Sequence, residues 1–200
     1  MKKVLVLLAG YPGTGKSHIS NLLQAQLKSL VMVSQDEIKE AIWELYGFSN
    51  LDEKEALVGK SWHQYYEIME QYMNDGRSII SDYPFSEKQK PTLEKLSNQY
   101  HYEVITVRLL ADLDVLYQRQ HHRDIQPTRH LSHIMTSYHA GDELENRLDA
   151  DALLSYEEFI HRCTTRGYDT FALGHLIEVD VSDFENVNYP ALIQHIMSFT

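Results

Sequence analysis

The chain has 200 residues, 43% of them hydrophobic, which is enough for one domain with its own core. Its formal net charge of −11 repels polyanions over most of the surface and disfavours a long nucleic-acid footprint. The single cysteine, Cys163, excludes an intrachain disulfide, and no apolar run approaches the roughly 18 residues expected of a membrane span. These bulk properties favour a cytoplasmic enzyme that does not enter a membrane.

The first predicted element is a buried strand over residues 3–9, a continuous apolar run, and a glycine-rich loop follows it. The loop matches the pattern G-x-x-x-x-G-K-[ST] in full with the residues Gly10-Tyr11-Pro12-Gly13-Thr14-Gly15-Lys16-Ser17. A helix is expected to start near Lys16, because apolar residues then recur at helical spacing at Ile19, Leu22, Leu23 and Leu27. Strand, loop and helix are the context in which this motif binds phosphate. An ordinary Gly/Pro turn is the alternative.

The residue types of this loop suit the phosphates of a nucleotide. Glycines let the backbone wrap an anion with successive N–H groups pointing inward, and the start of the helix adds its positive dipole end. The Lys16 ammonium can reach the outer phosphates, and the Ser17 hydroxyl can ligate Mg²⁺. We therefore expect residues 10–17, together with His18, to bind the phosphates.

A short second strand is predicted over residues 30–33, and a helix over residues 36–46 follows it. Asp36 stands directly after this strand, where a carboxylate would face the phosphate loop. It could accept the proton of a substrate hydroxyl, which is the role of the base in phosphoryl transfer. Helix capping is the alternative, because Ser34 and Glu37 fit a capping box and an acidic residue suits a first helical turn.

A long helix is predicted over residues 51–74, and a third strand over residues 77–82. The helix carries an aromatic series, either packed in the core or forming an acceptor pocket, that consists of Trp62, Tyr65, Tyr66 and Tyr72. Asp82 ends the strand, where an acid in a protein with this loop commonly organises Mg²⁺ through water. A turn residue ahead of Pro84 is the alternative.

The second half of the chain continues to alternate between helices and strands. The predicted helices cover about residues 87–99, 112–122, 153–165 and 189–199, and the predicted strands cover residues 103–110 and 176–181. Such alternation implies a parallel sheet with helices on both faces. Ligands then bind beyond the carboxyl ends of the strands, where the phosphate loop, Asp36 and Asp82 are expected.

Arginine supplies the positive charge of this half, since no lysine follows Lys95. Arg119 and Arg123 are four residues apart and would share a helix face, and Arg129 follows in a polar segment. The three arginines could close over the transferring phosphate and neutralise its charge, an effect of about 10³-fold or more where it is measured. A solvated helix face is the alternative. We expect a mobile lid at about residues 119–140.

Together these segments resemble the small P-loop kinases of the AAA-like, zeta-toxin-like and polynucleotide-kinase-like group. The resemblance extends from residue 1 to about 185 and rests on Gly10–Ser17, Val33–Lys39, Gly76–Asp82, Arg108–Arg119, Arg123, Arg129 and His130. It implies a three-layer α/β fold in which five parallel strands, in the order 2-3-1-4-5, have helices on both faces and a small lid. It also implies a single domain over residues 1–200, with ATP and Mg²⁺ as cofactors.

The same resemblance implies roles for individual residues. Asp36 would activate an acceptor hydroxyl, and Arg119 would contact the donor phosphates or the adenine. Arg123 and Arg129 would act from the lid. Where the family often has an arginine that holds an acceptor phosphate, this chain has Lys39, which favours a small hydroxyl-bearing acceptor over a 3′-phosphorylated polynucleotide.

We therefore expect an ATP-dependent phosphotransferase that moves the γ-phosphate to a hydroxyl of a small molecule, nucleoside or nucleotide. Lys16, Asp36, Arg119, Arg123 and Arg129 are its predicted catalytic residues. A polynucleotide 5′-hydroxyl kinase is a second interpretation. A third, from another class, is an ATP-binding switch protein that hydrolyses ATP slowly. The sequence does not specify the acceptor or the oligomeric state.

Overall fold

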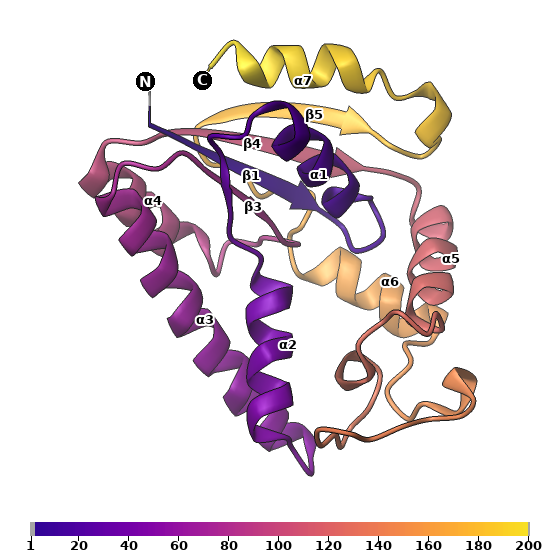
Figure 1. The fold of residues 1–200 in the computed structure, drawn as a ribbon. Helices are drawn as coiled ribbons and strands as arrows, with labels where there is room; N and C mark the ends of the chain where they lie inside the picture. The colour runs from indigo at the N-terminus through magenta and orange to yellow at the C-terminus, as the bar shows by residue number, and fades with distance from the viewer. Residues whose placement is uncertain (1–2, 200) are drawn as a thin grey trace.

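Five parallel strands form one sheet in the order β2-β3-β1-β4-β5 in the computed structural model, which describes residues 3–199 (Figure 1). The strands are β1 (Val4–Gly10), β2 (Val31–Met32), β3 (Ile79–Asp82), β4 (Glu103–Leu110) and β5 (His175–Asp180). Every neighbouring pair in the sheet is parallel. This order and direction confirm the predicted fold.

Helices follow each strand and cover the sheet on both faces. They are α1 (Lys16–Gln26), α2 (Gln35–Tyr46), α3 (Leu51–Asn74), α4 (Lys90–Tyr100), α5 (Leu113–Asp124), α6 (Tyr156–Thr165) and α7 (Tyr189–Met197). Short 3₁₀ turns lie at Leu131–His133, Arg147–Asp149 and Phe184–Asn186. No helix within the described residues is long and apolar enough to cross a membrane.

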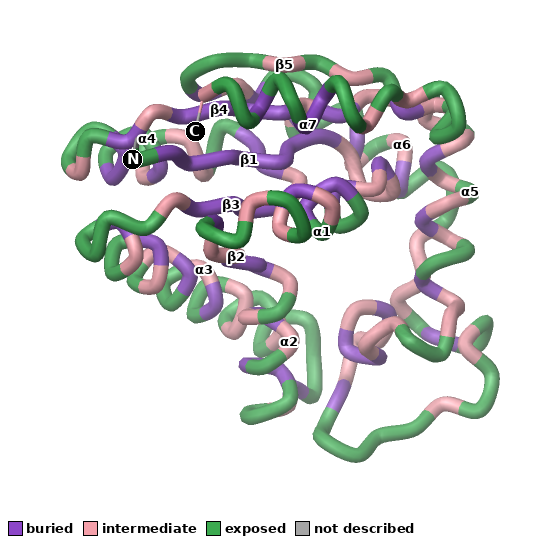
Figure 2. Tube along the Cα trace, turned by 45° about the horizontal axis from the view of Figure 1, so that its top comes forward, coloured by how far each residue is buried: buried purple, intermediate pink, exposed green. Residues whose placement is uncertain are grey.

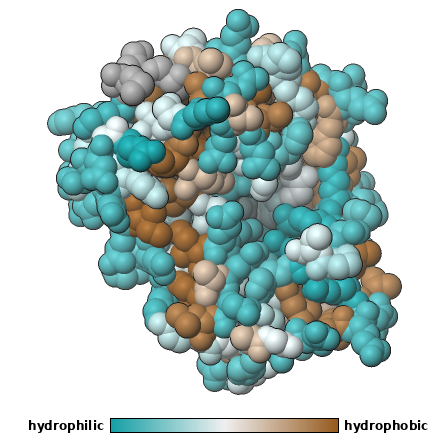
Figure 3. Space-filling view, viewed as in Figure 1, coloured by the Kyte–Doolittle hydropathy of each residue, from teal (hydrophilic) through white to brown (hydrophobic). Residues whose placement is uncertain are grey.

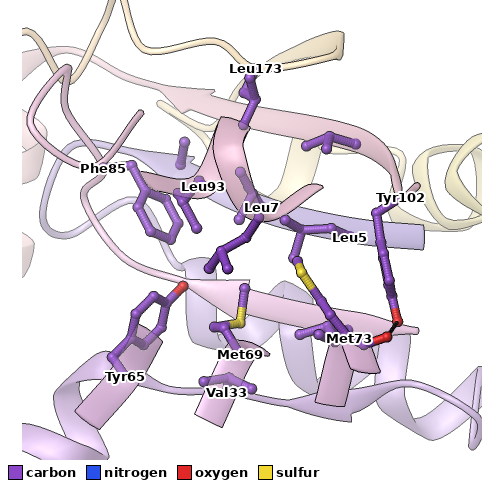
Figure 4. Packing of buried hydrophobic residues seen from close by; sticks show 14 of the residues in the cluster. Leu5, Leu7, Val33, Tyr65, Met69, Met73, Phe85, Leu93, Tyr102 and Leu173 are labelled. Carbon is purple, nitrogen blue, oxygen red and sulfur yellow. Dashed lines mark hydrogen bonds between the residues drawn. The ribbon is translucent and has the colours of Figure 1, made fainter. Parts of the chain in front are cut away.

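The strand at the centre, β1, is buried on both faces, as Figure 2 shows (Figure 2). Its alternate side chains enter two separate apolar clusters, because successive side chains of a strand point to opposite faces. The cluster under α3 and α4, drawn in Figure 4, includes Leu5, Leu7, Met69, Met73 and Leu93 (Figure 4). The cluster under α1 and α7 includes Val4, Val6, Leu8, Ile19 and Ile193. The sheet is therefore the middle of three layers.

The aromatic residues of α3 pack in or against the core cluster under α3 and α4. Tyr65 is fully buried, and its hydroxyl lies 2.8 Å from that of Ser81 in β3 (Figure 4). Trp62 packs edge-to-face with Tyr65 at 5.2 Å and with Tyr83 at 4.8 Å between ring centroids. Of the two interpretations of this series, core packing is the one that the structure favours.

Residues 125–153, between α5 and α6, pack as a separate module against α2 and the start of α3. Its apolar cluster consists of Trp43, Phe48, Leu131, Ile134, Tyr138 and Ala150. Phe48 and Tyr138 exchange two backbone hydrogen bonds of 2.7 Å, so the module is tied to the turn after α2. The predicted lid over about residues 119–140 covers the end of α5 and the first part of this module, and its mobility stays a prediction.

The carboxyl ends of the parallel strands meet at one edge of the sheet. The phosphate loop follows β1, and Asp82 ends the neighbouring strand β3, where it lies beside Leu8 in the register. Asp36 stands in the first turn of α2, just after β2. The fold thus brings the predicted phosphate, metal and base residues to one edge, where ligands bind in open parallel sheets.

Candidate active site

The loop between β1 and α1 has a backbone that only glycine can adopt at two points. Gly10 has φ +113°, and a Cβ there would lie 2.1 Å from the carbonyl oxygen of Leu109 in β4. Gly13 has φ +84°, and its Cβ would lie 2.9 Å from the carbonyl oxygen of Leu116 in α5. The loop therefore packs tightly against β4 and α5. A glycine-rich backbone of this kind can turn its N–H groups toward an anion.

Lys16 lies inside the curve of this loop and is almost fully buried. Its ammonium donates hydrogen bonds to the carbonyl oxygens of Gly10 at 3.1 Å and Tyr11 at 2.6 Å, and to the hydroxyl of Thr14 at 3.1 Å. Burial lowers the pKa of Lys16 to about 7, against the opposing charge of Asp82. A phosphate bound beside Lys16 would raise this pKa again, so that the amine would carry its full positive charge next to the anion.

Ser17 and Asp82, the two predicted metal ligands, form a hydrogen-bonded pair beside the loop. The Ser17 hydroxyl donates to Oδ2 of Asp82 at 2.8 Å. Burial raises the pKa of Asp82, and this hydrogen bond opposes that effect. Within residues 3–199 no group of three or more His, Cys, Asp or Glu side chains could hold a metal ion. An ion bound here would need further oxygen ligands from phosphate and water.

Asp36 lies in the first turn of α2 and forms an ion pair with Lys39, with 2.6 Å between Oδ1 and Nζ. Burial opposes its ionisation, but Lys39, His133 and Arg129 together hold the pKa of Asp36 well below its usual range. Helix capping also occurs, because the Ser34 hydroxyl accepts a hydrogen bond from the backbone N–H of Glu37 at 3.4 Å. The two interpretations of this segment are therefore compatible: Ser34 caps the helix, and Asp36 stays available for chemistry.

Asp36 and the phosphate loop each directly follow a strand at the same edge of the sheet. The charges of Asp36 and Asp82 both act on Lys16, and the charge of Asp36 acts on Asp82. The face of the molecule drawn in Figure 1 is hollowed near its middle, and hydrophilic residues surround much of the hollow (Figure 3). The structure thus brings together the donor loop, the proposed metal pair and the proposed base.

Arg119 turns away from Arg123 although the two residues are four apart on α5. Its guanidinium donates to the carbonyl oxygens of Val181 at 2.7 Å and Ser182 at 2.8 Å in the loop after β5. Its Cζ lies 3.7 Å from the ring centroid of Phe184, and this ring lies close to Gly15 of the phosphate loop. The expected contact of Arg119 with the donor phosphates or the adenine stays a prediction.

Arg123 and Arg129 share the carboxylate of Asp124, with 3.5 Å from each Nε to Oδ1. The side chain of Arg123 is 45% exposed, and its positive charge helps to lower the pKa of Lys16. Arg129 is largely buried and lies 3.7 Å from Oε1 of Glu40 in α2. Its charge reaches Asp36, but its contacts join the module over residues 125–153 to α2.

Sequence reasoning did not single out Arg162, in α6, and Arg166, which directly follows that helix. Both charges act on the phenol of Tyr83, which directly follows Asp82 and on which the charge of Asp36 also acts. Only Arg162 lies within the helix predicted over residues 153–165, so the spacing of four between the two arginines was a weak signal. By contrast, Arg108 pairs with Glu178 at 2.7 Å and stabilises the sheet edge.

His18 begins the outer face of α1 and packs edge-to-face with Tyr189 of α7, at 5.3 Å between ring centroids. This contact joins two helices of one layer. His18 directly follows the phosphate loop in the chain, and its part in nucleotide binding stays a prediction.

Comparison with known proteins identifies the family of this arrangement. Residues 5–139 match the family model described as AAA domain, which is more than half of the chain. No curated protein is significantly similar to the chain.

Solved structures with the same fold include several kinases. A candidate kinase from Chloroflexus aurantiacus J-10-fl is 23% identical, with a TM-score of 0.77 and 100% of both chains covered. The APS kinase of Mycobacterium tuberculosis is 12% identical, with a TM-score of 0.59 and 99% of this chain and 97% of that chain covered. The shikimate kinase of Bacteroides thetaiotaomicron is 16% identical, with a TM-score of 0.57 and 98% and 97% covered. At these identities the likeness shows a P-loop kinase fold.

Proposed function

Since the chain belongs to the AAA domain family and has the P-loop kinase fold, we propose that it transfers the γ-phosphate of ATP to a hydroxyl of a small molecule, nucleoside or nucleotide. The observation that carries this proposal is the meeting of Lys16, the Ser17–Asp82 pair and Asp36 at one edge of the sheet. The names of two similar structures, a shikimate kinase and an APS kinase, support a small acceptor.

The donor phosphates would bind in the loop of residues 10–17. The loop amides and the Lys16 ammonium would hold the β- and γ-phosphates, with Lys16 exchanging its contacts to the carbonyls of Gly10 and Tyr11 for phosphate oxygens. Arg119 and Phe184 would contact the base of the nucleotide. Arg123, on the exposed side of α5, would face the transferring group. Arg129 would help to position it through Asp124, whose carboxylate both arginines contact.

The Ser17 hydroxyl and the Asp82 carboxylate suit Mg²⁺, since this ion prefers oxygen ligands and retains several waters. Ser17 would ligate the ion directly and Asp82 through water. When bound, Mg²⁺ supplies positive charge to the β- and γ-phosphate oxygens.

Asp36 would act as the base. The acceptor oxygen forms a bond to the γ-phosphorus while the bond from phosphorus to the β–γ bridging oxygen breaks, and ADP leaves with the electron pair. The hydroxyl proton passes to Asp36. Because Lys39 and its neighbours keep the pKa of Asp36 low, the carboxylate is ionised at neutral pH and its main contribution is to orient the hydroxyl.

The other two interpretations are less well supported. A polynucleotide 5′-kinase needs a basic groove that leads to the base, but the cation nearest to Asp36, Lys39, is already paired with it, and the net charge of −11 opposes a polyanion. A nucleotide-dependent switch has no need of a carboxylate that faces the phosphate loop. The need for ATP and the single cysteine favour the cytoplasm as the site of the reaction.

The test is transfer of phosphate with ATP and Mg²⁺ to pooled nucleosides, short oligonucleotides, aminoglycosides and other hydroxyl-bearing metabolites, followed by the mass gain of one phosphate. Asp36→Asn should lower transfer by about 10²- to 10⁴-fold and leave ATP binding unchanged. Lys16→Ala should abolish both.

The matched control is Asp52→Asn, an exposed acid in the first turn of α3, which should transfer phosphate at the wild-type rate. Normal transfer by Asp36→Asn would contradict the role of Asp36. ATP binding without any phosphorylated acceptor would favour the switch, and phosphorylation of oligonucleotides alone would favour the polynucleotide kinase.

A further inference from the structure

Lys39, a buried lysine of α2, has an ammonium group that three separate side chains hold in place. Its Nζ lies 2.6 Å from Oδ1 of Asp36, three residues earlier on the same helix. It also lies 5.2 Å from the centroid of the Trp43 ring and 5.7 Å from that of the Tyr83 ring. An ammonium at such a distance is attracted to the negative face of an aromatic ring. One carboxylate and two rings therefore share this cation.

The two rings are themselves fixed by other contacts. Trp43 is buried in the apolar cluster that the module over residues 125–153 shares with α2. Tyr83, directly after β3, packs edge-to-face with Trp62 of α3 at 4.8 Å between ring centroids. The rings thus join α2 to the module and to the edge of the sheet, and they limit the positions open to the Lys39 ammonium.

Exposure distinguishes the two members of the ion pair. The side chain of Lys39 is 11% exposed, whereas that of Asp36 is 38% exposed. An acceptor that enters from solvent would therefore reach the carboxylate and not the ammonium. Lys39 occupies Oδ1 of Asp36, and within residues 3–199 Oδ2 accepts no hydrogen bond. This second oxygen is open to a hydroxyl group.

The charge of Lys39 also keeps Asp36 ionised. Burial opposes the ionisation of Asp36, and Lys39 has the largest of the effects that hold its pKa well below its usual range. In the part of the chain that the structure describes, Lys39 alone forms an ion pair with Asp36. Other groups whose charges interact with that of Asp36 are Glu40 on α2, Arg129 and His133 in the module, Lys16 on α1, and Asp82 and Tyr83 at the end of β3.

We propose that Lys39 is a positioning residue, which holds the Asp36 carboxylate by Oδ1 so that Oδ2 meets the acceptor hydroxyl. The inference rests on the proposed function, in which Asp36 is the base, and it assigns Lys39 to that base and not to the acceptor. The hydroxyl proton passes to Asp36, and Lys39 keeps its own protons. A carboxylate free to change rotamer would be misplaced part of the time, and a misplacement of about 1 Å can cost about 10²-fold in rate.

The kinetic test removes and then restores the charge of Lys39. Lys39→Met keeps a long side chain without the ammonium and should lower kcat about 10- to 100-fold, with KM for ATP little changed. Lys39→Arg again offers a cation to the carboxylate and should recover most of the rate. Lys60→Met is the matched control and should leave kcat unchanged, because the exposed Lys60 ammonium also lies over a ring, that of Tyr46, at 3.7 Å.

The kinetic parameters separate positioning of the base from binding of the acceptor. If Lys39→Met raised only KM for the acceptor and left kcat unchanged, Lys39 would bind the acceptor and the proposal would be overturned. Wild-type kinetics in this variant would overturn it as well. Should Lys39→Met not fold, Lys39→Gln, which has an N–H donor but no charge, is measured by the same criteria.

A second measurement does not depend on finding the acceptor. The carboxyl carbon signal of Asp36 is followed by NMR as the pH is lowered in the wild type, Lys39→Met and Lys60→Met. Because a cation in contact favours the charged carboxylate, Asp36 in Lys39→Met should become protonated at a pH about 1 to 3 higher than in the other two proteins. Protonation at the same pH in all three overturns the proposal, even if transfer is established. A higher pH in Lys39→Met without any phosphorylated acceptor would place the failure in the proposed function.

Discussion

At the scale of single residues, the site relies on groups whose charges are held by neighbours. Asp36 is paired with Lys39, Arg123 and Arg129 share Asp124, and the Lys16 ammonium is enclosed by loop oxygens. Such pre-placed charges reduce the reorganisation that a reaction needs at the moment of transfer. The effect of removing one of them should therefore appear in a specific measurement and not as a general loss of structure.

Asp82 gives the first such prediction. Its carboxylate accepts the Ser17 hydroxyl at 2.8 Å, so Asp82→Asn should weaken the hold on Mg²⁺ without removing Ser17. We expect the Mg²⁺ concentration for half-maximal transfer to rise about 10- to 100-fold. A magnesium titration of activity measures this, with Asp75→Asn, an exposed acid at the end of α3, as control. An unchanged magnesium requirement would remove Asp82 from the metal site.

His133 gives a prediction about stability and pH. It is buried against Trp43, and its Nε2 lies 2.6 Å from Oε1 of Glu40. Burial lowers the pKa of His133 to about 4, and the hydrogen bond with Glu40 only partly opposes this. Between pH 6.5 and pH 4 the unfolded chain therefore binds a proton at this residue that the folded chain does not. The folded state should lose about 1–3 kcal/mol as the pH falls through this window.

Urea unfolding at pH 7 and pH 5 measures this contribution as the difference between the wild type and His133→Gln. The glutamine amide can still donate to Glu40 but does not titrate, so the variant should lose less stability than the wild type between the two pH values. Equal losses of stability in the two proteins would show that the pKa of His133 does not change on folding.

At the scale of elements, the phosphate loop depends on backbone shape as much as on side chains. A Cβ at Gly10 would lie 2.1 Å from the Leu109 oxygen at φ +113°, so Gly10→Ala should destabilise the fold by about 3 kcal/mol or more or prevent folding. Gly59, inside α3, has no atom within 4 Å of a Cβ, and Gly59→Ala should stabilise by about 0.5–1 kcal/mol. Opposite shifts of the urea midpoint are expected, and parallel shifts would contradict this account.

The elements also show what the sequence could predict. The helix predicted over residues 51–74 has those bounds in α3, because a capping asparagine and a long amphipathic pattern mark it. The helix predicted from residue 153 starts three residues later, at Tyr156. Its apolar signal included Leu153 and Leu154, which instead pack in two different clusters, and Ser155 forms the capping box.

Short sequence motifs were sufficient to predict the parts of the site that lie close together in the chain or at the end of a strand. The loop and its partner Asp82 follow from a motif and a strand end. The opposite directions of Arg119 and Arg123 do not, since both lie on one helix and the loop after β5 draws Arg119 away. The pairing of Asp36 with Lys39 is an i,i+3 contact within α2 that the sequence spacing could have indicated. The position of Arg129 between Glu40 and Asp124 depends on how the module over residues 125–153 packs on α2, which no short pattern encodes.

At the scale of the whole molecule, the apolar residues divide into clusters that differ in size and in their position relative to the sheet. The two clusters of the sheet layers include every residue of β1 from Val4 to Ala9. The cluster of the module over residues 125–153 is smaller and lies away from the sheet, with few regular elements. A module of this kind should open locally without unfolding of the sheet.

Amide hydrogen exchange tests this division. Amides of residues 131–138 should exchange at a lower opening free energy than those of β1 and β4. Phe48→Ala, which removes a fully buried ring from the apolar cluster that the module shares with α2, should speed exchange in the module and leave β1 unchanged. Equal protection of module and sheet would mean that the molecule opens as one unit, and it would argue against a lid in this segment.

The two outer strands of the sheet have a consequence for aggregation. β2 has only two residues, and β5 presents the exposed side chains of His175, Glu178 and Asp180 along the other edge. A very short edge and a charged edge both oppose the addition of a strand from another copy. Growth of the sheet into fibrils is therefore disfavoured at neutral pH.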